Sequence, residues 1–353
     1  MVKEQHRLRV GITCGDINGI GYEVIIKAIS DPRMLQMIIP VIYGSAPTLS
    51  YHRKAIRAND FQFQIVDSAK ELNKKKVNII NAWTEEVKIE LGKANQVSGK
   101  AALNSIEMAI GDLAAGLLDV VVTAPINKKA IQEAGFKFPG HTEYLQNYAQ
   151  APDALMIMCS ENLKVAVVTG HIPLSEVAQN LTTEDIVGKI KLFHDSLERD
   201  FLIHAPKIAV LGLNPHAGEN GTMGEEEQKI IHPAIKQARE SGIFVHGAFP
   251  ADGFFGSAQV GKYDGVLAMY HDQGLTPFKA LSFGGGVNFT AGLPVVRTSP
   301  DHGTAMEIAG LNKASGDSMR RAIYEACTIF NNRLKHKEMT SNVLEIKKGK
   351  KIS

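Results

Sequence analysis

The feature that most limits the fold of this chain is a series of short apolar runs that alternate with segments of helical periodicity. Each run has the length and unbroken hydrophobicity of a strand buried on both faces. The clearest runs lie at residues 8–13, 38–43, 119–123, 154–159, 165–169, 208–213 and 266–269. Helical patterns lie at 22–29, 98–117, 126–134, 183–197, 225–241 and 318–334. This alternation predicts an α/β protein with a largely parallel sheet covered on both faces.

The sequence shows no internal boundary. No linker rich in Pro, Gly or Ser interrupts its 353 residues, a length that suffices for two ordinary domains or one large molecule of two lobes. Two lobes on a shared or interleaved sheet therefore fit better than two separate domains. Ser98 is the expected N-cap of the 98–117 helix.

Composition excludes several classes of protein. The net charge of +2 predicts no nucleic-acid partner, although residues 335–353 carry six lysines against two glutamates, which we interpret as a solvated end. The three cysteines lie far apart and form neither a disulfide framework nor a CxxC metal site, which fits a reducing cytoplasm. We see no apolar signal segment and no apolar run of about 18 residues. We therefore expect a cytoplasmic protein without a membrane segment.

Polar side chains are concentrated in the stretch 264–303, beside one of the apolar runs. That run, at 266–269, is soon followed by His271 and Asp272. Lys279, a glycine triplet, Asn288 and Arg297 come next. Ligand sites in open α/β sheets lie beyond the carboxyl ends of the strands. The stretch is therefore the predicted floor of an active site.

Three histidines share one local setting. His171, His216 and His271 each follow a predicted buried strand by one or a few residues. Since the carboxyl ends of parallel strands lie on one side of a sheet, the three imidazoles could converge. Three protein nitrogens and an open position are typical of a catalytic metal site. Any one of them alone is better explained as a capping or hydrogen-bonding residue, and only the repeated placement favours a metal.

Candidate anion contacts come from the PGHTEY segment and from two cations. His141 and Thr142 begin a predicted helix, where backbone N–H groups favour an anion, although Thr142 alone could be only an N-cap. Lys279 and Arg297 could hold a phosphate or carboxylate, or be ordinary surface charges. The loop GDINGIG, from residue 15, matches no phosphate-loop pattern, so we interpret it as a tight turn.

Two carboxylates are placed to assist catalysis. Asp252 and Asp272 could each orient a metal-bound histidine or transfer a proton. Asp252 could instead be a turn residue before Gly253. Together with Lys279 they are the candidates for the general base, in no firm order.

A series of motifs, in chain order, resembles the 4-hydroxythreonine-4-phosphate dehydrogenase family of pyridoxal phosphate biosynthesis. They are GDINGIGYE, VVTAPINKKA, GHTEYL, VTGHIPL, LNPHAGENG, PADGFF, YHDQGLTPFK, GVNFTAGLP and RTSPDHGTA, between Gly15 and about Ala309. The resemblance implies a two-lobed fold of the isocitrate and isopropylmalate dehydrogenase type, with the active-site cleft between the lobes. We expect the first lobe, on the cofactor side, from 1–125 plus 290–353. The second, with the metal, substrate and dimer interface, should be 126–289.

The resemblance also assigns residues. It places one divalent metal per subunit (Zn, Mg, Mn or Co) on His171, His216 and His271. The substrate contacts become His141, Thr142, Lys279, Asn288 and Arg297. NAD or NADP would lie near His302, Gly303 and Thr304. The family further implies a homodimer with a shared active site, in which we expect His171 and His216 from one subunit and His271 from its partner.

The implied reaction is oxidation of the C3 hydroxyl of 4-phosphooxy-L-threonine by NAD, followed by loss of CO2 to give 3-amino-2-oxopropyl phosphate.

Ile17 and Tyr22 stand where the family usually has prolines, and Gly253 where it often has threonine. These departures leave room for a related dehydrogenase of D-threonate or D-erythronate 4-phosphate; some relatives oxidise a cyclic diol. Two rival classes are a non-redox metal enzyme and an inactive binding protein. An inactive binding protein should have lost one of His171, His216 and His271, or else Lys279.

Overall fold

The computed structural model describes residues 7–341, and its central feature is a mixed sheet of twelve strands. The strands are β1 (Leu8–Thr13), β2 (Ile38–Gly44), β3 (Phe63–Ile65), β4 (Val77–Asn81), β5 (Val120–Thr123), β6 (Leu155–Cys159), β7 (Lys164–Thr169), β8 (Ile208–Leu211), β9 (Val245–Phe249), β10 (Gly265–Tyr270), β11 (Val287–Ala291) and β12 (Arg297–Pro300). Their order across the sheet is β3-β4-β2-β1-β5-β12-β11-β6-β7-β10-β8-β9. The α/β class with a largely parallel sheet is therefore confirmed.

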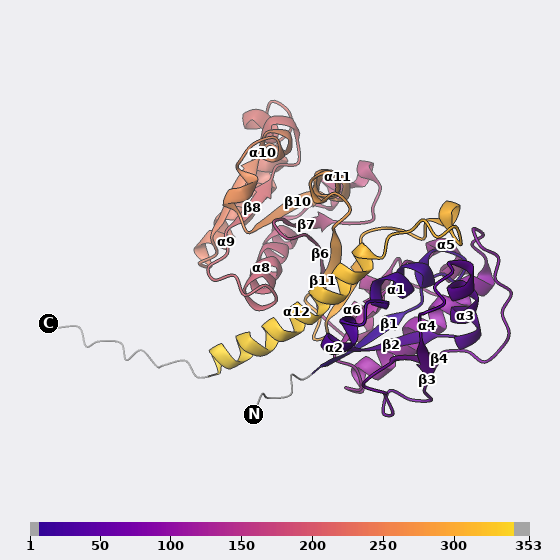
Figure 1. Ribbon diagram of the computed structural model, residues 1–353. Helices are drawn as coiled ribbons and strands as arrows, with labels where there is room; N and C mark the ends of the chain where they lie inside the picture. Colours follow the sequence, from indigo (N-terminus) through magenta and orange to yellow (C-terminus); the bar gives the residue numbers. More distant parts are fainter. Residues whose placement is uncertain (1–6, 342–353) are drawn as a thin grey trace.

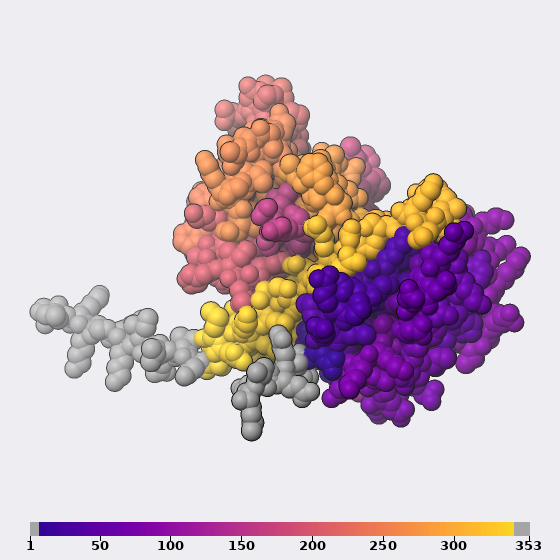
Figure 2. All heavy atoms as spheres, viewed as in Figure 1, coloured from indigo at the N-terminus to yellow at the C-terminus, as the bar shows by residue number. Residues whose placement is uncertain are grey.

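Two parallel blocks meet at an antiparallel centre. One block runs from β3 to β12 and the other comprises β7, β10, β8 and β9. Between them, β11 is antiparallel to both β12 and β6, and β6 is antiparallel to β7. Figure 1 shows the blocks as two bodies, indigo to magenta and pink to orange, and Figure 2 shows them as separate bulges joined in the middle.

Helices cover the strands. They are α1 (Gly21–Ile29), α2 (Met34–Met37), α3 (Ala46–Ala55), α4 (Gln96–Ala114), α5 (Lys128–Glu133), α6 (His141–Tyr148), α7 (Val177–Asn180), α8 (Thr183–Arg199), α9 (His232–Glu240), α10 (Ala251–Phe255), α11 (His271–Ser282) and α12 (Asp317–Thr340). None of the helices within residues 7–341 combines the length and apolar character needed to cross a bilayer. Residues 1–6 and 342–353, which include the end of the lysine-rich segment, lie outside the described part.

The expected N-cap of α4 was wrong by three residues. The cap is Asn95, whose side-chain oxygen accepts a hydrogen bond from the Ser98 backbone N–H at 2.9 Å. The Ser98 hydroxyl in turn accepts from the Asn95 backbone N–H at 3.3 Å. This reciprocal pair is a capping box, in which serine takes the third helical position. The helix also ends at Ala114, before the expected residue 117.

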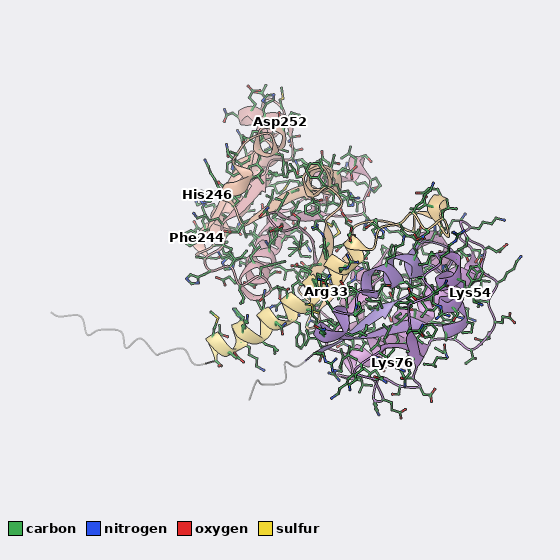
Figure 3. All side chains as sticks on the ribbon, viewed as in Figure 1. Arg33, Lys54, Lys76, Phe244, His246 and Asp252 are labelled. Atoms are coloured by element: carbon green, nitrogen blue, oxygen red, sulfur yellow. The ribbon has the colours of Figure 1, made fainter. Side chains whose placement is uncertain are left out.

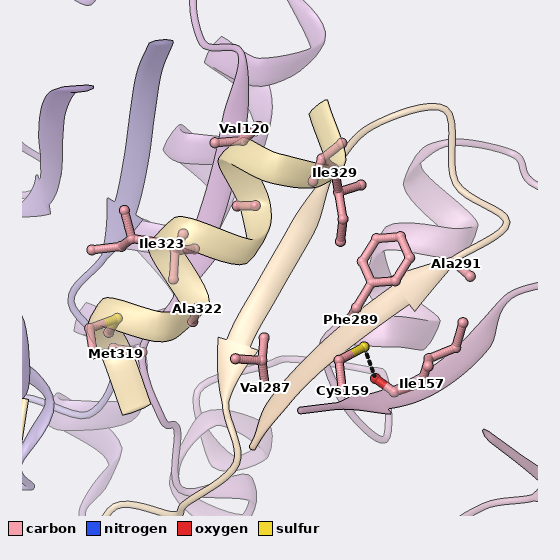
Figure 4. Close-up of a cluster of buried hydrophobic side chains, with 14 of the residues drawn as sticks. Val120, Ile157, Cys159, Val287, Phe289, Ala291, Met319, Ala322, Ile323 and Ile329 are labelled. Carbon is pink, nitrogen blue, oxygen red and sulfur yellow. Dashed lines mark hydrogen bonds between the residues drawn. The ribbon is translucent and has the colours of Figure 1, made fainter. Parts of the chain in front are cut away.

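The closing helix α12 joins the two blocks. It packs across β12, β11 and β5 and also contacts α1 and α8 (Figure 1). Its inner face is apolar and fully buried, and Figure 4 shows this face against the central strands. The buried side chains are Met319, Ala322, Ile323, Ala326 and Ile329. Each larger side chain stabilises the fold by about 1.5–3 kcal/mol through burial.

The expected lobe boundary at residue 125 can be compared with the packing around it. Helices α5 and α6 lie beyond that boundary, yet Ile131 and Leu145 share a buried cluster with Ile106 of α4 in the first block. Phe136 joins the same cluster. The division into 1–125 plus 290–353 and 126–289 stays a prediction.

Candidate active site

A cavity of about 290 Å³ opens on one face of the central strands. Side chains two apart in a strand lie on the same face of a sheet. Met156 and Met158 of β6 therefore project together, as do Arg297 and Ser299 of β12, and Asn288 of β11 joins them. The register places Met158, Asn288 and Ser299 side by side. Helices α5, α6 and α11, the segments at the ends of β5 and β7, and residues 300–303 form the rest of the wall.

Arg297 is a buried cation on the floor of this cavity. It is 3% exposed, and its guanidinium donates hydrogen bonds to the Thr123 hydroxyl at 2.6 and 3.0 Å and to the Thr290 hydroxyl at 3.3 Å. Both acceptors are neutral, and burial lowers the Arg297 pKa to about 10. A buried charge is costly unless it is paired. An anion bound in the cavity could therefore pair with the charge of Arg297.

His141 and Thr142 lie in the first turn of α6 and line the same cavity. The N-cap is Gly140, so the alternative role of Thr142 as a cap is excluded. Nε2 of His141 is buried without a hydrogen-bond partner among the described residues. Burial, and then the charges of Arg297 and Lys128, lower the His141 pKa well below its usual value. A neutral imidazole with an unpaired nitrogen, beside first-turn N–H groups, can contact a polar ligand.

His171 and His271 lie side by side because they follow neighbouring parallel strands, β7 and β10. Their ring centroids are 5.5 Å apart. Nδ1 of His271 lies 2.6 Å from Oδ1 of Asp272, a contact that can fix the tautomer and leave Nε2 as an acceptor or metal ligand. Burial, followed by the charge of Lys128, lowers the His171 pKa, so this ring also favours its neutral form.

His216 does not join this pair within one chain. It lies five residues beyond the end of β8, in a loop whose residues 216–220 all have positive φ, and its side chain is exposed. Residues 7–341 contain no group of three His, Cys, Asp or Glu side chains that could hold a metal ion. Of the three histidines expected to converge, only His171 and His271 therefore lie together within one chain. The expected grouping of His171 with His216 is not seen within one chain, where His171 lies beside His271 instead.

The remaining predicted residues divide between the cavity and its surroundings. Lys279, His302 and Gly303 line the cavity with Asn288. Asp272 borders a second hollow, which His171 and His271 also line, and its side chain is 80% exposed. Asp252 is exposed on α10, at the outer end of the second block (Figure 3), and is not among the cavity residues. The structure therefore does not bring Asp252 together with the other candidates in one chain.

The GDINGIG loop is the tight turn that the sequence favoured. Gly15 has a φ of 67°, and a Cβ there would lie 2.4 Å from the Pro125 carbonyl oxygen. The Ile20 N–H donates to the Thr304 carbonyl at 3.1 Å. The loop thus braces the segment that carries His302 and Gly303, whereas Thr304 itself is outside the cavity lining.

Sequence reasoning missed several cavity residues. Lys128, Glu143, Ser299 and Asp301 line the cavity but were not proposed as site residues. Lys128 and Glu143 lie in motifs that were already singled out, VVTAPINKKA and GHTEYL. The sequence therefore did contain a signal for these two residues. Each is a charged residue in the first turn of a predicted helix near the end of a predicted strand.

Comparisons with known proteins show the family of this chain. The family model described as "Pyridoxal phosphate biosynthetic protein PdxA" matches residues 36–326. A 4-hydroxythreonine-4-phosphate dehydrogenase from Bacteroides thetaiotaomicron is 52% identical over 344 residues, which cover 97% of this chain and 94% of that protein. A "Putative D-threonate 4-phosphate dehydrogenase" from Oceanobacillus iheyensis is 41% identical, over 90% of this chain and 96% of the relative.

A solved structure gives the same result. The crystal structure of 4-hydroxythreonine-4-phosphate dehydrogenase from Klebsiella pneumoniae has a TM-score of 0.78 and 37% identity, and the match covers 92% of this chain and 98% of that one. Sequence family, relatives and fold therefore coincide over nearly the whole length. The chain belongs to the PdxA family of pyridoxal phosphate biosynthetic proteins.

Proposed function

We propose that this protein is a 4-hydroxythreonine-4-phosphate dehydrogenase. It would oxidise 4-phosphooxy-L-threonine with NAD or NADP and release CO2 and 3-amino-2-oxopropyl phosphate in pyridoxal 5'-phosphate biosynthesis. The observation that carries the proposal is the cavity around Arg297, a buried cation without an anionic partner among the described residues, in a chain whose relatives bear this name. Its expected location is the cytoplasm, with no nucleic-acid partner.

Substrate binding would use the cations and unpaired polar atoms of the cavity. Arg297 offers a planar fork that suits a carboxylate or phosphate, and Lys279 adds a second positive charge. His141 Nε2 and Asn288 Oδ1 are buried without partners in the described chain, so each would gain a hydrogen bond from a polar substrate. These contacts would fix the hydroxyl-bearing carbon relative to the nicotinamide.

Cofactors are proposed on the residues that fit them. His302 and Gly303 line one end of the cavity, and Nε2 of His302 is buried without a partner in residues 7–341, as expected beside a bound dinucleotide. His171 and His271, whose rings lie side by side, would hold one divalent ion (Zn, Mg, Mn or Co) with His216 of a second subunit. When bound, such an ion lowers the pKa of the substrate hydroxyl and polarises the ketone.

The protein's own groups would orient and transfer protons. Asp272 fixes the His271 ring through Nδ1. Of the three candidates for the general base, Lys279 alone lines the cavity within one chain, since neither Asp252 nor Asp272 is among the cavity residues. The apolar side chains of Met156, Met158 and Leu275 reduce the access of water to the reacting carbon.

A homodimer with a shared site is part of the proposal. His216 is exposed on its loop, and Leu174, beside the hollow next to His171, is 71% exposed. Exposed groups at these positions are what an isologous interface would cover. A partner contributing His216 would complete the pair formed by His171 and His271.

The test is a comparison of phosphorylated threonine, threonate and erythronate with NAD or NADP and added metal. Reduction of the cofactor, read at the NADH absorbance band, should be fastest with 4-phosphooxy-L-threonine. Preference for threonate would instead favour the activity named in the Oceanobacillus relative. No cofactor reduction with any of them would refute a dehydrogenase of these substrates and favour non-redox metal chemistry.

A further inference from the structure

A single side chain bridges two strands of the second block at the point where their backbone pairing ends. Strands β10 and β8 pair in parallel as far as Leu267 and Val210. Two residues further along the first strand, Oε1 of Gln273 accepts a hydrogen bond from the Met269 N–H at 2.7 Å. Nε2 of the same side chain donates to the Gly212 carbonyl oxygen at 2.6 Å. The Gln273 carboxamide therefore continues the connection between the strands beyond their backbone ladder.

Close packing of α11 lets one side chain reach both strands. Gln273 is the third residue of this helix, where a glutamine usually bonds back to the N-cap. The helix lies tightly against the strands, since an added Cβ at Gly274 would be 2.9 Å from a Val165 side-chain carbon and 3.1 Å from the Ala268 Cβ. The carboxamide therefore enters between β10 and β8 instead of capping its own helix.

The two bridged backbone groups lie shortly before two of the proposed metal-binding histidines. Met269 is two residues before His271, and Gly212 is four residues before His216. Residues 216–220 follow a left-handed path outside any strand ladder, so the base of their loop determines where the His216 side chain lies. Gln273 thus joins the strand end that leads to one histidine with the loop base that leads to another.

A further hydrogen bond extends this connection to the third histidine. The hydroxyl of Thr169 donates to the Met269 carbonyl oxygen at 2.8 Å. Thr169 is the last residue of β7 and lies two residues before His171. Met269 is therefore held from both sides, through its carbonyl by Thr169 and through its N–H by Gln273.

We propose that Gln273 is a positioning residue for the metal site, holding the strand end that leads to His271 at a fixed distance from the base of the loop that leads to His216. The inference rests on the proposed function, because it concerns the metal ion proposed for these histidines. Ligands that are already held in place lose less freedom when the ion binds, so the ion binds more tightly. Both hydrogen bonds of Gln273 go to backbone groups, so it acts on the histidines through Met269 and Gly212.

The experiment titrates Zn²⁺ into the full-length protein after its metal has been removed with a chelator. It compares wild type, Gln273→Met and the matched control Gln96→Met. Gln96 also lies in the first turn of a helix, α4, and donates to the Glu133 carbonyl oxygen at 3.0 Å. Calorimetry should show Zn²⁺ binding to Gln273→Met weakened by about tenfold or more, whereas Gln96→Met should match wild type. Circular dichroism establishes that each variant is folded.

Two further measurements separate positioning from a general loss of structure. Excess Zn²⁺ should restore kcat of Gln273→Met to within about threefold of wild type, with an unchanged KM for 4-phosphooxy-L-threonine, because the substrate contacts are intact. Gln273→Glu keeps an acceptor for the Met269 N–H and suits the first turn of a helix, but it places a second acceptor against the Gly212 carbonyl. It should therefore weaken Zn²⁺ binding as Gln273→Met does.

The outcomes that contradict the inference are distinct from those that contradict the proposed function. Wild-type Zn²⁺ affinity in folded Gln273→Met, or in Gln273→Glu, would overturn the positioning role and leave the dehydrogenase function intact. If Gln273→Met does not fold, Thr169→Val decides in its place, because it removes only the bond to the Met269 carbonyl and should also weaken Zn²⁺ binding. If the wild type binds no Zn²⁺, the proposed metal site fails and the inference fails with it.

Discussion

At the scale of single residues, Arg297 sets the strongest limit on the ligand. It is held by two threonine hydroxyls rather than by a carboxylate, so its charge is available to a substrate anion. Lysine would keep the charge but lose the planar fork. We predict that Arg297→Lys lowers kcat/KM for the phosphorylated substrate by roughly 10- to 100-fold.

The control for this substitution is Arg33→Lys, which alters an exposed arginine paired with Asp31 and should leave steady-state kinetics unchanged. Circular dichroism would establish that both variants are folded. Equal use of phosphorylated and unphosphorylated substrates by the wild type would contradict the idea that the cavity anchors an anionic group.

A second residue-scale prediction concerns stability and pH. Burial lowers the pKa of His52 to about 4 from 6.5, and its Nε2 lies 2.8 Å from the Ile17 carbonyl oxygen. The unfolded chain therefore binds a proton at higher pH than the folded chain does. The resulting stabilisation is fully present above pH 6.5 and is lost as the pH falls to about 4.

The size of this effect is on the order of 3 kcal/mol in the free energy of unfolding. Urea unfolding of His52→Gln between pH 7 and pH 4 should show a weaker pH dependence than the wild type. His232→Gln, at an exposed position on α9, serves as the control and should keep the wild-type dependence. An identical pH dependence in all three proteins would show that His52 does not titrate in this range.

At the scale of elements, the loop after β8 shows what the sequence could and could not predict. The apolar runs predicted β7 and β10, and their adjacency brings His171 and His271 together. His216 was expected beside them because it also follows a strand. A run of left-handed residues carries it away, and such a backbone path leaves no hydrophobic periodicity to detect.

Strand direction and one helix cap could not be predicted for similar reasons. Strands β11 and β6 are antiparallel to their neighbours, and the direction of a buried strand is not encoded in its apolar run. The N-cap of α4 was misplaced because both Asn95 and Ser98 are good capping residues and only their mutual hydrogen bonds distinguish the two positions. Arg297 was identified from the polar stretch 264–303 as either an anion contact or an ordinary surface charge, and only the folded structure shows that it is buried.

The loop that presents His216 depends on Glu227, which sequence reasoning also missed. This buried carboxylate accepts hydrogen bonds from the backbone N–H groups of Leu213 and Asn214 at 2.7 and 2.8 Å. Burial raises its pKa, but these bonds and the Asn214 side chain outweigh burial, so the net pKa is lowered. The loop is therefore tied to the π-helical turn 227–231 that follows it.

We predict that Glu227→Ala destabilises the protein by about 2–4 kcal/mol, because two backbone donors lose their acceptor. Urea unfolding gives the free energy, and hydrogen exchange should increase most in residues 213–224. Glu225→Ala, an exposed glutamate paired with Lys229, is the matched control and should cost less than about 1 kcal/mol. Equal effects of the two substitutions would show that Glu227 does not hold the loop.

At the scale of the whole molecule, the two parallel blocks lie on either side of the antiparallel centre, and the cavity draws on both. Arg297 belongs to the first block, while His171 and His271 follow strands of the second. The helix α12 fixes the blocks against the central strands. Since each chain supplies two adjacent histidines and exposes the third, the proposed metal site is complete only when two chains associate.

The central claim is that one dehydrogenase site combines His171 and His271 of one subunit with His216 of the other, and mixed dimers test it directly. Each single His→Ala variant should be inactive in cofactor reduction with 4-phosphooxy-L-threonine. Mixing His216→Ala with His271→Ala chains should restore up to about a quarter of wild-type activity, because half of the random dimers are mixed and each contains one intact site. Mixing His171→Ala with His271→Ala should restore none. Recovery in the second mixture, or no recovery in the first despite demonstrated mixed dimers, would contradict the account.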